Sequence, residues 1–125
     1  SVVVCETNYV QNSEINCAGD FFCKKGGYNS IIQVEGNIKI YGVCRGGEIS
    51  CAGDIYIWEL GGSSMSATTL RAAKDSRLTI DYCHSNIRIY QGKELIRIEE
   101  DVQKLEISRE KGTLQVGKLK WDGRN

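Results

Sequence analysis

The sequence contains no proline, one methionine and one histidine among 125 residues. Its sixteen Lys and Arg balance its sixteen Asp and Glu, so there is no net positive field to attract nucleic acid or an anionic membrane surface. The apolar runs are too short for a signal peptide or a membrane span. Composition therefore excludes direct membrane insertion and gives no reason to expect nucleic acid as a partner.

Nucleotide-binding phrases are also absent, because the sequence has neither a Walker loop nor G-x-G-x-x-G. The length predicts one domain. The chain starts with SVVV and has no initiating methionine, so we expect it to be a piece of a longer soluble, cytoplasmic protein.

Six cysteines are present, and five lie beside apolar residues. Free cysteine is among the most buried residue types, so we expect reduced thiols packed in a core. A zinc site needs four convergent ligands, usually from paired C-x-x-C spacings, and no such pair occurs. We expect all six to be free: Cys5, Cys17, Cys23, Cys44, Cys51 and Cys83.

Three of the fourteen glycines follow a period. Gly19, Gly36 and Gly53 are seventeen residues apart, and each is followed by Asp or Asn. An apolar, any, apolar triplet stands on both sides of each glycine, as in Ile32-Gln33-Val34 and Ile38-Lys39-Ile40. Such alternation indicates short, half-buried strands. We expect the glycine to provide a positive φ at the corner and the Asx side chain to bond the turn backbone.

Two short strands per repeat cannot bury their apolar faces alone, so the repeats must stack. The sequence predicts an all-β, right-handed, single-stranded parallel β-helix (β-solenoid) of about five coils of roughly 17 residues. Equivalent residues would lie on adjacent coils about 4.8 Å apart. Val34 would then separate Cys17 from Cys51, which puts those two beyond disulfide reach. Asp20, Asn37 and Asp54 would form a corner ladder that spaces the coils, which we prefer to a cation site.

The rhythm loosens after Leu60 but persists in Leu70-Arg71-Ala72, Leu78-Thr79-Ile80 and Ile87-Arg88-Ile89. Val2 to Val4 fits the end of an earlier unit. We assign residues 1–98 to the repeat region. Residues 99–125 are highly charged and predict a strand, a turn at Glu110 to Gly112 and a second strand, which would close the last coil.

Several phrases carry a family resemblance: "SEINCAGDFFCKKGG", "SIIQVEGNIKIYGVCRGGEISCAGDIYIWELGG" and "CHSNIRI". They resemble the β-helix of the FapA family, a polymer-forming bacterial domain, over roughly Val2 to Ile98. The resemblance implies a non-catalytic scaffold or self-association module that needs no cofactor. Its partners would be copies of itself, and a bacterial morphogenesis or envelope protein is a further candidate.

Two alternatives stay open. "GNIKIYGVCRGG" also resembles the C-terminal domain of the division regulator MinC, but the R-S-G-Q phrase by which MinC domains engage their ATPase partner is absent, so no partner residues carry over. A β-helical spacer of a glutamate-synthase-type enzyme also uses repeated glycine turns. Sequence upstream of Ser1 would separate these possibilities.

Catalytic and calcium-binding interpretations are weaker. Cys83 and His84 are consecutive, so on a strand their side chains point to opposite faces and cannot act as nucleophile and base. Calcium-binding β-rolls need a nine-residue repeat, which does not match a period of seventeen. We therefore predict no enzyme activity and no bound metal.

The outward residues form two columns. The first is polar and is predicted to read Asn16, Gln33, Ser50, Arg71 and Arg88. The second contains aromatic residues and is predicted to include a self-association surface, because neighbouring exposed aromatics are typical of interfaces. Aromatic residues also suit β ladders for structural reasons, and we give the two interpretations equal weight. The candidate surface consists of Phe22, Lys39, Tyr56 and Thr79, with Trp58 at the next corner.

Overall fold

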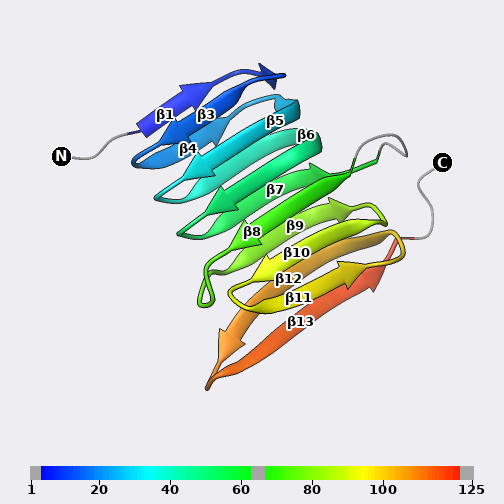
Figure 1. Ribbon diagram of the computed structural model, residues 1–125. Coiled ribbons are helices and arrows are strands. Elements are labelled where there is room, and N and C mark those ends of the chain that lie inside the picture. The colour runs from blue at the N-terminus through cyan, green and yellow to red at the C-terminus, as the bar shows by residue number, and fades with distance from the viewer. Residues whose placement is uncertain (1–3, 63–66, 122–125) are drawn as a thin grey trace.

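Stacked strands form nearly the whole structure. The computed structural model describes residues 4–62 and 67–121, and within them the chain winds into an all-β, parallel β-solenoid of about five turns with bridges roughly 17 residues apart (Figure 1). This confirms the predicted fold class. Of the residues predicted to end an earlier unit, Val2 and Val3 lie outside the described residues.

The described residues form thirteen strands, which make up one sheet that wraps around the solenoid. In chain order they are β1 (Val4–Thr7), β2 (Val10–Gln11), β3 (Glu14–Cys17), β4 (Asp20–Cys23), β5 (Gly26–Val34), β6 (Ile38–Cys51), β7 (Ile55–Leu60), β8 (Thr68–Ala72), β9 (Leu78–Cys83), β10 (Ile87–Gln91), β11 (Glu94–Ile98), β12 (Val102–Glu110) and β13 (Thr113–Lys120).

The core consists of columns of stacked inward side chains. One column runs from Phe21 through Ile38 and Ile55 to Leu78, and another runs from Ile40 through Ile57 to Ile80. All of these side chains are at most 2% exposed. The column Cys17, Val34, Cys51 is also present in the predicted order. The alternation in each short triplet therefore fixes which side chains fill the solenoid.

The corners with Gly19, Gly36 and Gly53 stack directly, since Gly36 N–H donates to Gly19 O at 2.9 Å and Gly53 N–H to Gly36 O at 3.0 Å. The predicted positive φ at these glycines is wrong, because none of the three has one. At Gly36 and Gly53, space is the reason for glycine instead. A Cβ on Gly36 would lie 2.3 Å from Asp20 Oδ1 and 2.7 Å from Gly19 C, and Gly53 is equally crowded by Asn37 and Gly36.

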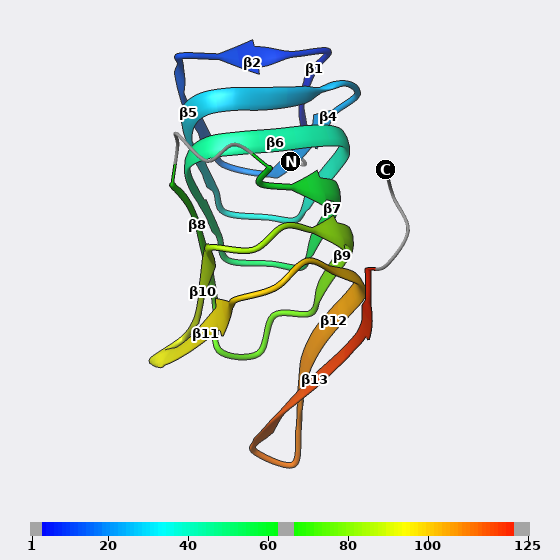
Figure 2. The same ribbon diagram turned by 90° about the vertical axis from the view of Figure 1, so that its right-hand side faces the viewer.

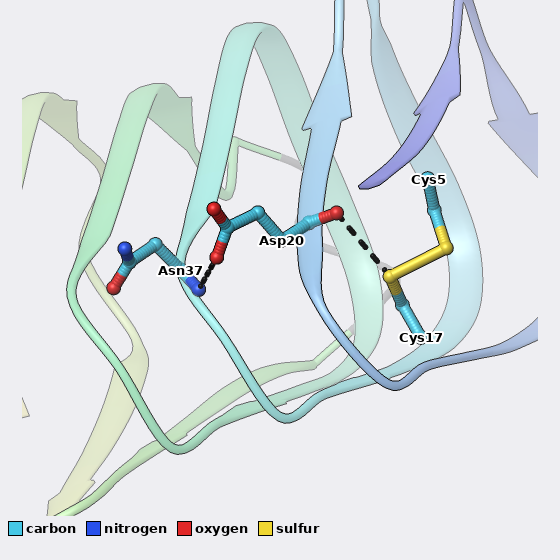
Figure 3. Close-up of a disulfide and its surroundings, with 4 residues drawn as sticks. All are labelled: Cys5, Cys17, Asp20 and Asn37. Carbon is cyan, nitrogen blue, oxygen red and sulfur yellow. Dashed lines mark hydrogen bonds between the residues drawn. A yellow bond between two sulfur atoms is a disulfide. The ribbon is translucent and has the colours of Figure 1, made fainter. Parts of the chain in front are cut away.

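The prediction that all six cysteines are free is wrong, because Cys5 and Cys17 form a disulfide (Figure 3). Cys5 pairs with Phe21 and so continues one inward column, while Cys17 begins another. The prediction compared equivalent positions within a column, whereas these two columns meet across the first corner. Their Cα atoms lie 6.3 Å apart, within disulfide range. The other four cysteines are free and buried.

The looser later repeats shift one predicted column. Leu70 pairs with Ile89 rather than with Ile87, so Tyr90 and not Arg88 lies beside Arg71. The Arg71 guanidinium lies 4.5 Å from the centroid of the Tyr90 ring. Arg88 is instead opposite Thr69. The inserted turns between β8 and β10 changed the offset between coils, which the aligned triplets did not reveal.

The C-terminal end of the solenoid is formed by two antiparallel hairpins, β10–β11 and β12–β13 (Figure 2). Strand β12 also pairs antiparallel with β9, which ends the parallel stacking. Arg109 connects the hairpins, because its Nη1 lies 2.9 Å from Glu94 Oε1 and its Nε donates to Lys74 O at 2.8 Å.

Candidate functional site

The outward face over β4, β6, β7 and β9 carries the predicted aromatic column. Phe22 pairs with Lys39, Lys39 with Tyr56 and Tyr56 with Thr79, so these four residues share one face in successive coils. Lys39 is exposed, and Phe22, Tyr56 and Thr79 are half-buried. The sequence therefore identified the correct neighbours on this face.

Sequence reasoning missed Tyr41, which lies on the same face. Its ring centroid is 5.1 Å from that of Phe22 and 5.5 Å from that of Tyr56. Lys39 lies between Phe22 and Tyr56 in the column, and Tyr41 connects these two rings. Tyr41 is 48% exposed. Extending the alternation of Lys39-Ile40 by one more residue would have placed Tyr41 outward, but the repeat pattern ended at Ile40.

A second row of rings continues the first toward the C-terminal end. Trp58 contacts Tyr82 with ring centroids 5.6 Å apart, and Tyr82 contacts Trp121 at 5.1 Å. Trp58 was predicted at a corner but lies within β7, two residues from Tyr56 and therefore on the same face. We call the combined surface the aromatic band: Phe22, Tyr41, Tyr56, Trp58, Tyr82 and Trp121.

A hydrogen bond fixes the centre of the aromatic band. The Tyr56 hydroxyl donates to Asp81 Oδ2 at 2.6 Å. Burial, followed by this hydrogen bond and the charge of Asp81, raises the pKa of Tyr56 to about 12. The phenol therefore stays neutral at physiological pH, and the ring is held as part of a stable surface.

Buried charges lie next to the C-terminal part of the band. Glu59 is only 3% exposed, and its Oε2 lies 2.8 Å from His84 Nε2 and 3.7 Å from Arg45 Nη2. The His84 ring also contacts Trp121, with centroids 4.8 Å apart. Arg45 Nε donates to Gly61 O at 3.0 Å. The contacts of Glu59 connect three successive coils. The hydrogen bond with His84 and the charge of Arg45 explain how a carboxylate is tolerated here.

The thiol of Cys83 does not join this group. Cys83 is fully buried on the inward face, whereas the His84 side chain lies on the outer side with Glu59. Burial, with a smaller contribution from the charge of Asp101, raises the pKa of Cys83 to about 12, so the thiol stays protonated. The two residues therefore lack the geometry of a nucleophile and its base.

The corner ladder of Asp20, Asn37 and Asp54 uses its oxygens within the fold. Asn37 N–H donates to Asp20 Oδ1 at 2.8 Å (Figure 3), and Asp54 N–H donates to Asn37 Oδ1 at the same distance. Arg77 N–H donates to Asp54 Oδ1 at 3.0 Å. In residues 4–62 and 67–121, no group of three or more His, Cys, Asp or Glu side chains could hold a metal ion.

An open groove of about 640 Å³ follows the polar column on another face. Its outward lining is Asn16, Gln33, Ser50 and Arg71, and small corner residues such as Ala52 leave it open. Arg71 is already paired with Glu48. The free thiol of Cys51 lines the groove, but burial raises its pKa to about 11, so it stays protonated. The groove therefore has less to offer a ligand than the aromatic band.

Comparisons with known proteins do not identify a family. No family model, no curated protein and no solved structure matches this chain. Among the described residues, no helix has the length and apolar character needed to cross a membrane.

Proposed function

We propose that this chain is a non-catalytic structural scaffold that associates with copies of itself through the aromatic band. The observation that carries the proposal is two rows of contacting rings on the outward surface, Phe22–Tyr41–Tyr56 and Trp58–Tyr82–Trp121. Aromatic residues are enriched at protein interfaces, where they contribute large apolar areas. Tyr41 and Trp58 are the most exposed rings of the aromatic band, with exposed fractions of 48% and 36%.

The β-solenoid suits such a role. Its coils are joined by strand pairing along the whole molecule and enclose a core of tightly packed side chains, so the aromatic band is held on a stiff support. This proposal agrees with the resemblance to FapA-family β-helices, whose function as self-associating modules we extend to this chain. A bacterial morphogenesis or envelope protein is the second kind of partner we propose.

A cytoplasmic location is part of the proposal, and the disulfide provides its test. Disulfides are rare in cytosolic proteins, where thiols are kept reduced. If the location is correct, Cys5 and Cys17 should be reduced in protein alkylated during lysis of its own cells. Finding them joined at that stage would favour an oxidising compartment.

Replacing an exposed ring tests the self-association. We expect Tyr41→Ser to weaken association about tenfold or more, because a central aromatic side chain is a typical energetic hot spot. The double change Phe22→Ser with Tyr56→Ser should have a larger effect. Sedimentation velocity over a range of concentrations measures both.

Tyr9→Ser is the matched control. Tyr9 is 45% exposed and contacts a single ring, that of Tyr28 at 5.6 Å, outside the aromatic band. This variant should associate like the parent. A parent chain that stays monomeric at high concentration, or a Tyr41→Ser variant as strongly associated as Tyr9→Ser, would contradict the proposed interface.

A further inference from the structure

Strand β13 is the longest edge strand among the described strands. It covers eight residues and pairs only with β12. The strands at the N-terminal end, β1 to β3, have two to four residues, and β11 has five. The tip of the β12–β13 hairpin extends past the first residue of β9, since Leu78 pairs with Ile107 and the hairpin continues to Glu110 (Figure 2).

The turn of this hairpin determines which backbone groups face the free edge. Lys111 and Gly112 both have positive φ, at 51° and 79°, and form a two-residue turn. Such a turn closes on a hydrogen-bonded pair, here Glu110 and Thr113. Alternation then directs the N–H and C=O groups of Gln115 and Gly117 toward β12. Trp121 follows the same alternation, since its N–H donates to Asp101 O at 3.3 Å.

The backbone groups of the intervening residues therefore point away from β12: Leu114, Val116 and Lys118. Proteins usually protect such an edge with proline, a bulge in the edge strand or charged side chains, especially lysine. The lysines of β13, Lys118 and Lys120, lie in its C-terminal half. The chain has no proline, and the register shift of this hairpin lies in β12, between Gln103 and Glu106. The middle of β13 is apolar at Val116, which is 43% exposed.

We propose that β13 pairs with β13 of a second copy of this chain across a two-fold axis at Val116. The two strands run antiparallel, so Val116 faces Val116 of the other copy and Leu114 faces Lys118. All three outward-facing residues then form hydrogen-bonded pairs, which gives about six backbone hydrogen bonds between the copies. No two like charges face each other, because Lys118 is opposite a leucine, and the contact is isologous.

This inference adds a second contact to the proposed self-association and rests on that proposal. The two contacts share one side of the sheet, because Leu119 pairs with Gln103 and Gln103 with Tyr82 of the aromatic band. Leu119 is 52% exposed on that side. Edge pairing would therefore bring the bands of two copies into one longer surface.

Residue-specific amide hydrogen exchange on the unmodified chain tests the pairing. Raising the concentration from micromolar to millimolar should slow exchange at Val116 and Lys118 about tenfold or more. Gln115 and Gly117 should change little, because their N–H groups already bond to β12. Uniform changes at all four residues, or none in an associated sample, would overturn the edge contact.

Two proline variants test the β13 pairing independently, with association measured by sedimentation velocity. Val116→Pro and Lys118→Pro each remove an edge donor but no bond to β12, and each should weaken association about tenfold or more. Val116→Thr and Lys118→Thr keep the N–H and should associate like the parent. If a proline variant fails to fold by circular dichroism, the exchange pattern of the unmodified chain decides.

The outcomes separate the two contacts. Proline variants that associate like the parent, with Tyr41→Ser weakened, would overturn the edge contact and leave the aromatic band. If the proline variants weaken association and Tyr41→Ser does not, the result would support the β13 edge contact and contradict the aromatic band as an interface. A chain that is monomeric at millimolar concentration would overturn both.

Discussion

At the residue scale, the corner glycines show how tightly successive coils approach each other. The space that a side chain would need at Gly36 is occupied by Asp20 Oδ1 and by the backbone of Gly19. The Asp20 oxygen at the same time accepts the N–H of Asn37. Glycine and the Asx residue therefore act together. Because the glycine has no Cβ, there is room for the Asx side chain that hydrogen-bonds one coil to the next.

Gly36→Ala should destabilise the fold by about 1 to 3 kcal/mol, because inserting a methyl into a packed site forces the backbone to shift. Gly117→Ala is the control, since nothing lies within 4 Å of its added Cβ. Urea denaturation of both variants measures the difference. Equal losses would mean that the corner spacing does not explain the glycine.

Ile38→Ala should cost about 2 to 5 kcal/mol through lost burial and a residual cavity. Ile38 is 1% exposed and lies in the middle of an inward column. Gln33→Ala, on an exposed outward position, should cost less than about 0.5 kcal/mol. Similar shifts in melting temperature for the two variants would be incompatible with the observed register.

The buried thiols predict a loss of stability at alkaline pH. Burial raises the pKa of Cys44 and of Cys83 from about 9 to about 12. Between these values the unfolded chain loses the thiol protons and the folded chain keeps them, so stability is full below about pH 9 and falls as pH rises toward 12. Replacing both residues by alanine should flatten the decline in the free energy of unfolding, measured by urea titration at several pH values. A decline as steep as that of the parent would exclude the thiols of Cys44 and Cys83 as its cause.

At the scale of elements, the side chain of Arg109 links the two C-terminal hairpins. Arg109 contacts Glu94 of β11 and the Lys74 carbonyl from the turn before β9. Its side chain is 13% exposed, so these contacts are largely shielded from water.

Arg109→Ala should destabilise the fold by about 1.5 to 3 kcal/mol, the usual range for hydrogen bonds to a charged group. Glu94→Gln should cost under about 1 kcal/mol, because Glu94 is half exposed and the backbone contact remains. Thermal unfolding followed by circular dichroism compares them. If both changes cost the same, the ion pair with Glu94 and not the contact with the Lys74 carbonyl would be the main link.

At the scale of the whole molecule, the solenoid behaves as a stack in which each coil contacts only its neighbours. The first described coil has one neighbour, and the Cys5–Cys17 disulfide lies there. A cross-link in this coil limits its local fraying.

Reducing this disulfide should increase amide exchange in β1 to β3 and leave β6 to β9 unchanged, because the effect propagates only between adjacent coils. Thiol titration of the oxidised, denatured chain should find four free cysteines. Six free thiols before reduction would show that the disulfide does not form, and increased exchange throughout the chain would show that the solenoid unfolds as one unit.

The seventeen-residue period is enough to predict the solenoid and the inward and outward columns of its early coils. These follow from a repeating alternation, since each residue in a column has its counterpart one period away. For the same reason the repeat alone places Phe22, Lys39, Tyr56 and Thr79 together on one face. The core residues follow on the same basis, and all are at most 4% exposed: Val34, Ile38, Ile40, Ile55 and Ile57.

The contacts that do not repeat are set by the folded chain in three dimensions. Cys5 meets Cys17 across a corner, between columns that the period treats separately. Tyr90 replaces Arg88 beside Arg71, because the inserted turns set the offset between coils. Glu59 contacts His84, and Trp121 contacts both His84 and Tyr82. These contacts join segments that differ in length and do not repeat. Such contacts depend on how corners and turns bring different columns together in space. A periodic sequence pattern does not specify the distance between residues of different columns.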